Sequence, residues 1–196
     1  FMDEQIGRIL AEVERCLEMR ETIVVYTSDH GDLLGDHRII GKTAYHYDGG
    51  IRVPLLLRWD GHWVAGKTSD ALVETADIAA TLLAAAGLSS SVPPDGRSFH
   101  EVLEGRSDHH RDFVLIESFQ GAPEDRTPAP ANWARSIRTK RWRASFYPDP
   151  RWGELYDLEN DPNETRNLFK EPAHRETLNE LRERLVERLL TVNYPL

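Results

Sequence analysis

The stretch TIVVYTSDHGDLLGDHRIIGKTAYHYDGGIRVPLLL, residues 22–57, decides the fold of this chain. It opens with a β-branched run at residues 23–26, which is typical of a buried strand, and a second apolar run follows Gly49 and Gly50 at residues 53–59. Near-continuous apolar strands indicate a sheet that is covered on both faces. The flanking segments have helical periodicity, at residues 1–17 and at residues 69–86, where Gly87 is placed to end the helix. This order of elements predicts an α/β layer structure.

The second half of the chain has a different character. Residues 113–116 and 154–158 are predicted strands, and residues 134–147 alternate as one exposed antiparallel strand would. Residues 175–190 carry one leucine stripe among charged residues, which predicts a closing helix. We therefore expect residues 1–110 to form part of an α/β core, and residues 111–196 to form a small antiparallel β subdomain with a C-terminal helix.

Composition excludes several classes of protein. The 196 residues contain 33 acidic and 24 basic side chains, and the net charge of -9 disfavours nucleic-acid binding as the main function. No apolar run approaches the roughly 18 residues that a membrane span requires. The single cysteine excludes an internal disulfide framework and a cysteine-based zinc site. The chain opens inside a helical pattern, so we expect it to be a fragment of a longer protein.

Asp29 and His30 follow the first predicted strand directly. Ligands of α/β sheets bind at the carboxyl ends of the strands, where side chains converge without being needed for the core. Asp supplies an oxygen and neutral His a nitrogen, and the turn that Gly31 allows would let both reach one divalent cation. The alternative is that Asp29 caps a turn and that His30 is polar loop filler.

The later Gly41, Lys42 and Thr43 suggest a phosphate loop, but the spacing is wrong. The pattern G-x-x-x-x-G-K-[ST] would need glycine at position 36, which is Asp36, and Gly35 comes one residue too early. We therefore interpret Lys42 as a cation held near an anionic substrate. The alternative is an ordinary surface lysine.

Several separated motifs stand in a fixed order along the chain: TSDHGDLLGDH, then Lys42 thirteen residues after Asp29, then GGIRVPLLLRW, VETADIAATLLAAAGL and ELYDLENDPNETRNL. Together they closely resemble the C-terminal half of the type I sulfatases, members of the alkaline phosphatase superfamily. The resemblance covers nearly the whole chain. It implies part of an alkaline-phosphatase-like α/β/α sandwich, followed by a small antiparallel sheet packed by a C-terminal helix.

The resemblance also implies a mechanism. Asp29 and His30 match an Asp-His pair that binds a divalent metal, for which calcium is expected and magnesium or manganese are alternatives, and Lys42 matches the lysine that contacts the sulfate. The nucleophile of the family is a formylglycine made in the motif C-x-P-x-R. Here the cysteine stands in CLEMR, with Glu18 in place of proline, so we interpret Cys16 as a structural helix residue. The formylglycine is expected in a missing N-terminal half, and this chain alone should be inactive.

Four further residues are weaker candidates. Asp36 and His37 repeat the Asp-His pattern and are expected beside the site, where they could orient the ligands, although for His37 we prefer the alternative of a hydrogen-bonded structural histidine. Arg52 is expected to tie the loop to the sheet edge through a bidentate ion pair. His46 is a candidate for contact with substrate.

Three functions stay open at this point. The first is a sulfuric ester hydrolase acting on a small sulfate ester or a sulfated sugar, and the second is a phosphonate monoester or phosphodiester hydrolase of the same superfamily. The third is a non-catalytic interaction module, which the missing nucleophile would favour. A truncated chain should leave apolar strand surface uncovered and prone to self-association. His109 and His110 lie in a polar turn, without the partners or secondary structure that would make them a metal site.

Overall fold

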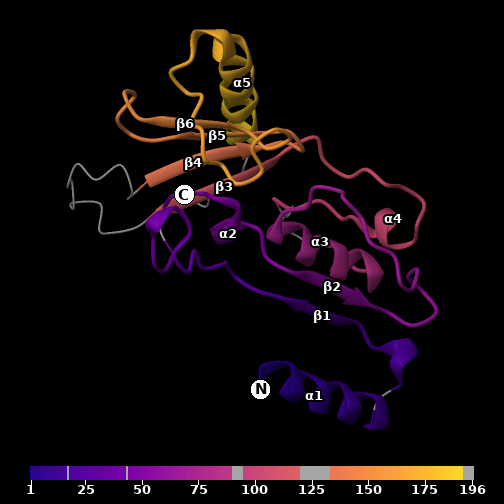
Figure 1. Cartoon of the computed structure of the whole chain (residues 1–196). Helices are drawn as coiled ribbons and strands as arrows, with labels where there is room; N and C mark the ends of the chain where they lie inside the picture. Colours follow the sequence, from indigo (N-terminus) through magenta and orange to yellow (C-terminus); the bar gives the residue numbers. More distant parts are fainter. Residues whose placement is uncertain (17, 43, 90–94, 120–132, 192–196) are drawn as a thin grey trace.

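The computed structural model describes residues 1–16, 18–42, 44–89, 95–119 and 133–191. Its first half holds two short strands with helices around them, and its second half holds a four-stranded sheet with a long helix (Figure 1). In chain order the elements are α1 Met2–Cys16, η1 Met19–Glu21, β1 Val24–Thr27, η2 Asp36–Arg38, α2 Asp48–Ile51, β2 Leu55–Arg58, α3 Thr75–Ala85, α4 His100–Leu103, β3 Val114–Phe119, β4 Trp133–Arg138, β5 Trp142–Phe146, β6 Gly153–Asp157, η3 Pro172–His174 and α5 Arg175–Thr191. No helix among the described residues is long and apolar enough to cross a membrane.

Strands β1 and β2 pair antiparallel, with Val24 opposite Arg58 and Thr27 opposite Leu55. Both predicted strands are therefore present, slightly shifted in their bounds. Tyr26 and Leu56 remain 40% and 58% exposed on this sheet. In the described part of the chain this sheet therefore leaves apolar surface uncovered, as we expected for a truncated chain.

Helix α3 begins six residues later than its periodicity suggested, because Glu74 caps it. The Asp77 carboxylate accepts a hydrogen bond from the Glu74 amide at 2.9 Å, and the Glu74 side chain caps the amide of Asp77 in return. Residues 69–74 consequently stay outside the helix. Gly87 ends the helix as predicted, with φ at +67° in the left-handed region.

The capping carboxylate of Asp77 also contacts His110. His110 is buried, and its Nε2 lies 3.1 Å from Asp77 Oδ2. Arg111 pairs with the same carboxylate, and the Arg97 amide donates to it at 2.7 Å. His110 is thus part of a buried ionic cluster beneath α3, whereas His109 is exposed as expected.

The four-stranded sheet has the order β3-β4-β5-β6, with every pair antiparallel. Its apolar face, which carries Ile137, Ala144 and Leu155, packs against α5. That helix contributes Leu178, Leu181 and Leu185 to the same core. The predicted antiparallel sheet packed by a C-terminal helix is therefore confirmed.

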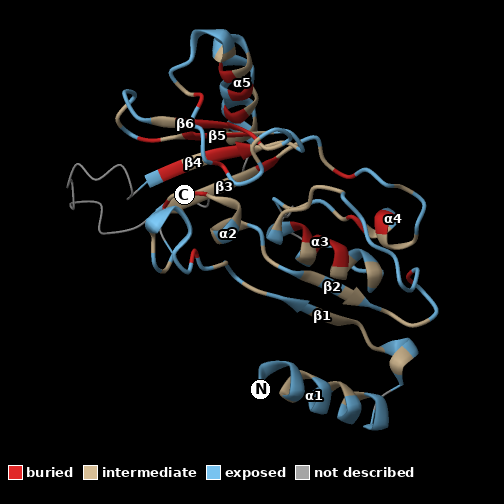
Figure 2. Ribbon diagram, viewed as in Figure 1, coloured by how far each residue is buried: buried red, intermediate tan, exposed pale blue. Residues whose placement is uncertain are grey.

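The segment at residues 134–147 differs from its prediction in two respects. It forms two strands, β4 and β5, and half of its residues are buried (Figure 2). The opposite face of the sheet carries Ser136, Ser145 and Glu154, which lie directly opposite one another across β4, β5 and β6 and are themselves buried. The alternation of apolar and polar residues at 134–147 predicted one solvent-exposed face. The polar residues instead lie on a second face of the sheet that is also buried.

Candidate functional site

The predicted metal pair lies just beyond the end of β1, in a tight turn. Ser28 Oγ donates to the carbonyl oxygen of His30 at 2.9 Å, and the His30 amide donates to Asp29 Oδ1 at 3.0 Å. The hydrogen bond from the His30 amide lowers the pKa of Asp29, and the nearby His30 ring adds to this effect. The side chain of Asp29 is 85% exposed, so an ionised carboxylate faces outward from the turn.

Position 31, directly after Asp29 and His30, accommodates only glycine. Its amide donates to the carbonyl oxygen of Gly50 at 2.9 Å, and an added Cβ would lie 2.0 Å from the carbonyl oxygen of Gly49. The backbone after the metal pair therefore rests directly on the Gly49–Gly50 turn, and a side chain would force the two segments apart.

Lys42 meets His30 in this turn. The His30 Nδ1 lies 2.8 Å from the Gly31 carbonyl oxygen, which can only accept, so Nδ1 carries the proton. The lone pair of Nε2 is then free to accept, and Lys42 Nζ lies 2.9 Å from it. Asp29 Oδ2 is 3.6 Å from the same nitrogen. The structure thus brings Asp29, His30 and Lys42 together.

This donor set fits part of a metal site. An ionised carboxylate and a neutral imidazole nitrogen, oriented by a backbone carbonyl, are ordinary ligands of a divalent cation. Among the described residues no group of three or more His, Cys, Asp or Glu side chains is placed to hold a metal ion. Asp29 and His30 would therefore supply two positions of a coordination shell that needs further donors from elsewhere.

His46 lies deep in the protein, 3% exposed. Its Nδ1 is 2.7 Å from Ser136 Oγ and its Nε2 is 3.0 Å from Ser118 Oγ. Burial, with a smaller effect of the nearby Arg143, lowers the pKa of His46 to about 4. Both ring nitrogens are thus bonded within the protein, and these contacts lend the predicted substrate contact no support.

Asp36 and His37 lie in the loop between His30 and Lys42. The His37 ring stacks on Tyr47, with centroids 3.6 Å apart and planes 7° from parallel. The Asp36 carboxylate lies beside Gly49. These contacts hold the loop, and the predicted role of both residues in orienting the ligands stays a prediction.

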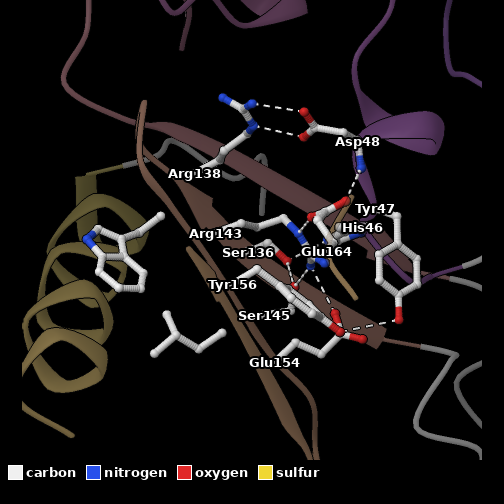
Figure 3. Close-up of polar contacts among 12 residues, drawn as sticks. His46, Tyr47, Asp48, Ser136, Arg138, Arg143, Ser145, Glu154, Tyr156 and Glu164 are labelled. Carbon is white, nitrogen blue, oxygen red and sulfur yellow. Dashed lines mark hydrogen bonds and ion pairs between the residues drawn. The ribbon is translucent and has the colours of Figure 1, made fainter. Parts of the chain in front are cut away.

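The prediction for Arg52 was wrong in its geometry. Arg52 is mostly exposed, and its Nη1 lies 3.9 Å from Asp48 Oδ2, beyond hydrogen-bond distance. Arg138 makes the bidentate pair instead, with Nε and Nη2 each 2.9 Å from an oxygen of Asp48 (Figure 3). The sequence offered no signal for this pairing, because the two residues lie 90 positions apart.

Cys16 ends helix α1, as the structural interpretation requires. Its thiol donates to Glu12 Oε1 at 3.1 Å, and this bond to a carboxylate raises the pKa of the thiol. A raised pKa makes the reactive thiolate scarce at neutral pH.

Comparison with known proteins identifies relatives of this chain. Residues 35–190 match the family model for the C-terminal region of N-sulphoglucosamine sulphohydrolase. An N-acetylglucosamine-6-O-sulfatase of Bacteroides thetaiotaomicron is 35% identical over 191 residues, covering 95% of this chain and 33% of the relative. An arylsulfatase of Clostridium perfringens is 30% identical over 191 residues, covering 96% of this chain and 38% of the relative. The chain therefore spans little more than a third of these relatives.

Solved structures give the same result. A sulfatase-like structure determined in complex with its substrate D-glucosamine-2-N,6-O-disulfate superposes with a TM-score of 0.82 at 32% identity, over 94% of this chain and 37% of that one. The phosphonate monoester hydrolase of Agrobacterium radiobacter superposes with a TM-score of 0.84 at 27% identity, over 96% of this chain and 39% of that one. The chain belongs to the sulfatase family, whose model for the C-terminal region of N-sulphoglucosamine sulphohydrolase matches most of it.

Proposed function

We propose that this chain supplies two metal ligands, Asp29 and His30, and a sulfate-contacting cation, Lys42, to a sulfatase that acts on a sulfated sugar. The observation that carries the proposal is the meeting of Lys42 Nζ and His30 Nε2 at 2.9 Å beside the exposed Asp29 carboxylate. The substrate class is supported by the relative named as a sulfatase of N-acetylglucosamine and by the similar structure in complex with a disulfated glucosamine.

Each residue has a distinct task in this proposal. The Gly31 carbonyl fixes the tautomer of His30 so that Nε2 can act as a ligand, and the Asp29 carboxylate offers a negatively charged oxygen. A divalent cation, for which calcium is our choice over magnesium or manganese, supplies Lewis-acid polarisation of the sulfate oxygens when bound. Lys42 holds a positive charge where negative charge develops on the leaving oxygen.

The remaining machinery belongs to residues beyond this chain. We infer that a formylglycine nucleophile and further acidic ligands come from an N-terminal region comparable to the rest of the relatives. Residues 1–110 would then complete the α/β core, while residues 111–196 form the attached antiparallel subdomain. On this view the chain on its own binds a cation weakly and hydrolyses nothing.

A second candidate is phosphonate monoester hydrolysis. It is favoured by the similarity to the phosphonate monoester hydrolase of Agrobacterium radiobacter, whose TM-score of 0.84 is as high as that of the disulfated glucosamine complex, 0.82. Asp29, His30 and Lys42 suit either tetrahedral anion. A non-catalytic interaction module is the alternative from a different class.

The test uses the complete gene product, assayed on an aryl sulfate and on the matched phosphonate monoester. We expect sulfate hydrolysis that falls at least 100-fold in Asp29→Ala and in Lys42→Met, about the loss expected for a group that stabilises developing charge. Asp108→Ala and Lys67→Met are matched controls, because these residues pair with each other at 2.8 Å elsewhere on the surface.

Calorimetry with calcium and manganese separates the roles of these residues. Asp29→Ala should weaken cation binding, whereas Asp108→Ala should not. Preferred hydrolysis of the phosphonate would select the second candidate. Activity that survives both Asp29→Ala and Lys42→Met would refute the site, and no hydrolysis of either ester would favour the interaction module.

A further inference from the structure

Three consecutive residues a few positions after Lys42 contact the polar face of the four-stranded sheet: His46, Tyr47 and Asp48 (Figure 3). His46 bonds to two serines of that sheet, and Asp48 forms the bidentate pair with Arg138. The Asp48 amide also donates to Glu164 Oε2 at 2.8 Å. The loop that carries Lys42 is therefore held by the four-stranded sheet and by Glu164, not only by its own turn.

Arg143 is the centre of this contact. Its side chain is completely buried, and Nη1 lies 2.9 Å from Glu154 Oε2 and 2.6 Å from Ser145 Oγ, while Nε donates to Glu164. Its guanidinium also lies over the ring of Tyr47, 5.1 Å from the centroid. One carboxylate, that of Glu164, thus bonds at once to the buried arginine and to the backbone of the Lys42 loop.

A buried ionic cluster of this kind is rarely explained by stability alone. Taking a guanidinium and two carboxylates out of water costs free energy that their attraction barely offsets, and well-packed apolar residues often do as well. Such a cluster does fix geometry, since its charge-assisted hydrogen bonds are directional. The geometry fixed here is that of Tyr47 and Asp48.

Tyr47 extends the contact to the other side of Lys42. Its ring stacks on His37, which lies five positions before Lys42, just as Tyr47 lies five positions after it. Both ends of the segment that presents the ammonium group are thus anchored to one buried cluster. The His37 backbone has φ at 53°, an unusual conformation for a non-glycine residue, which the stack helps to hold.

We propose that Glu164 and Arg143 are positioning residues for Lys42: through Asp48 and Tyr47 they keep its ammonium group at the site beside His30. The proposal rests on the proposed function of Lys42. Neither residue touches the substrate in this account. Displacement of a catalytic group by about 1 Å can cost up to about 100-fold in rate, so loosening the anchor should be visible in kcat.

A double-mutant cycle in the complete gene product provides the kinetic test. Glu164→Gln keeps the shape of the side chain but removes its charge, and should lower kcat for the aryl sulfate about tenfold with KM little changed. In a Lys42→Met background the same change should cost less than about twofold, because a positioning residue has nothing left to position. Glu159→Gln is the matched control, since Glu159 is exposed and pairs only with Arg141 at 3.3 Å among the contacts described.

The second readout does not depend on activity. In chelator-treated protein with ¹⁵N-labelled histidine, the Nε2 resonance of His30 reports the hydrogen bond from Lys42. Glu164→Gln should shift it in the same direction as Lys42→Met, and Glu159→Gln should leave it in place. If Glu164→Gln fails to fold, Tyr47→Leu takes its place, because it removes the stack on His37 and leaves the ion pairs of Arg143 intact.

The outcomes are distinct. Equal losses of kcat in both backgrounds, or a His30 resonance that stays at its wild-type position in the folded variant, would overturn the positioning role. A complete protein that hydrolyses neither ester would refute the proposed function instead, and the His30 resonance would then decide the positioning of Lys42 by itself.

Discussion

The ring of His46 shares a buried hydrogen bond with Ser136, with Nδ1 2.7 Å from Oγ. Ser136 Oγ in turn donates to Ser145 Oγ at 2.6 Å, so the serine oxygen accepts and His46 Nδ1 is the donor. Nε2 must then accept from Ser118 Oγ. The neutral ring thus forms a hydrogen bond with each of the two serine hydroxyl groups. A second proton on His46 would sit on Nε2 and remove the hydrogen bond that Nε2 accepts from Ser118 Oγ.

The pH dependence of stability should follow from this arrangement. The pKa of His46 falls from 6.5 to about 4 on folding, so only the unfolded chain takes up the proton between those values. His46 therefore does not lower the free energy of unfolding above about pH 6.5. As the pH is lowered toward 4, protonation of His46 in the unfolded chain reduces the free energy of unfolding by about 3 kcal/mol in all. Urea unfolding at pH 7.5 and pH 5 should show a loss about 2 kcal/mol larger in wild type than in His46→Gln. His109→Gln, at an exposed histidine, should behave like wild type, and parallel curves for all three proteins would contradict the prediction.

Gly31→Ala should push the turn that carries Asp29 and His30 away from the Gly49–Gly50 turn. The new Cβ would lie 2.0 Å from a backbone oxygen that cannot move without shifting its own segment. We expect a loss of stability of about 2 kcal/mol or more and weaker cation binding, measured by urea unfolding and calorimetry. Gly7→Ala is the control, because its Cβ meets nothing within 4 Å in helix α1 and should stabilise the helix by up to about 1 kcal/mol. Equal effects of the two changes would show that close packing at Gly31 is unimportant.

The residues of the candidate site could be singled out because their determinants are local. Asp29, His30 and Gly31 come just after a β-branched run, and the end of that run shows where the strand ends. Lys42 was placed by its spacing within a recognised series of motifs, and the contact with His30 agrees with it.

The anchoring residues could not be predicted, because their partners are distant in the sequence and polar. Glu164 accepts a hydrogen bond from the amide of Asp48, which lies 116 positions away, and the sequence around neither residue indicates this contact. Arg143 stands in a strand whose alternation suggests a solvent-exposed face, whereas the residue is completely buried. Hydrophobic patterns report burial against apolar surfaces, and they are silent about a face that is buried by ion pairs.

Asp77→Ala should be among the most damaging single changes in the chain. The carboxylate is fully buried and bonds to Arg111, His110 and two backbone amides, so its removal leaves a buried guanidinium with too few partners. We expect a loss of about 3 to 5 kcal/mol in the free energy of unfolding, measured by urea titration. Asp108→Ala removes an exposed carboxylate and should cost less than about 1 kcal/mol. A small effect at Asp77 would mean that the cluster is hydrated and of little energetic weight.

The contact between Lys42 and His30 leads to a prediction that separates metal binding from catalysis. The ammonium group occupies the lone pair of His30 Nε2 at 2.9 Å and places a positive charge where a cation would bind. Lys42→Met removes both the competitor for Nε2 and the repulsion, which for unit charges at 4 Å is about 1 kcal/mol even in water and doubles for a divalent ion. Cation affinity measured by calorimetry should therefore rise about tenfold while sulfate hydrolysis falls, and Lys67→Met should change neither. A variant that binds the cation less tightly than wild type would mean that Lys42 supports the metal turn, and that its place beside His30 is structural.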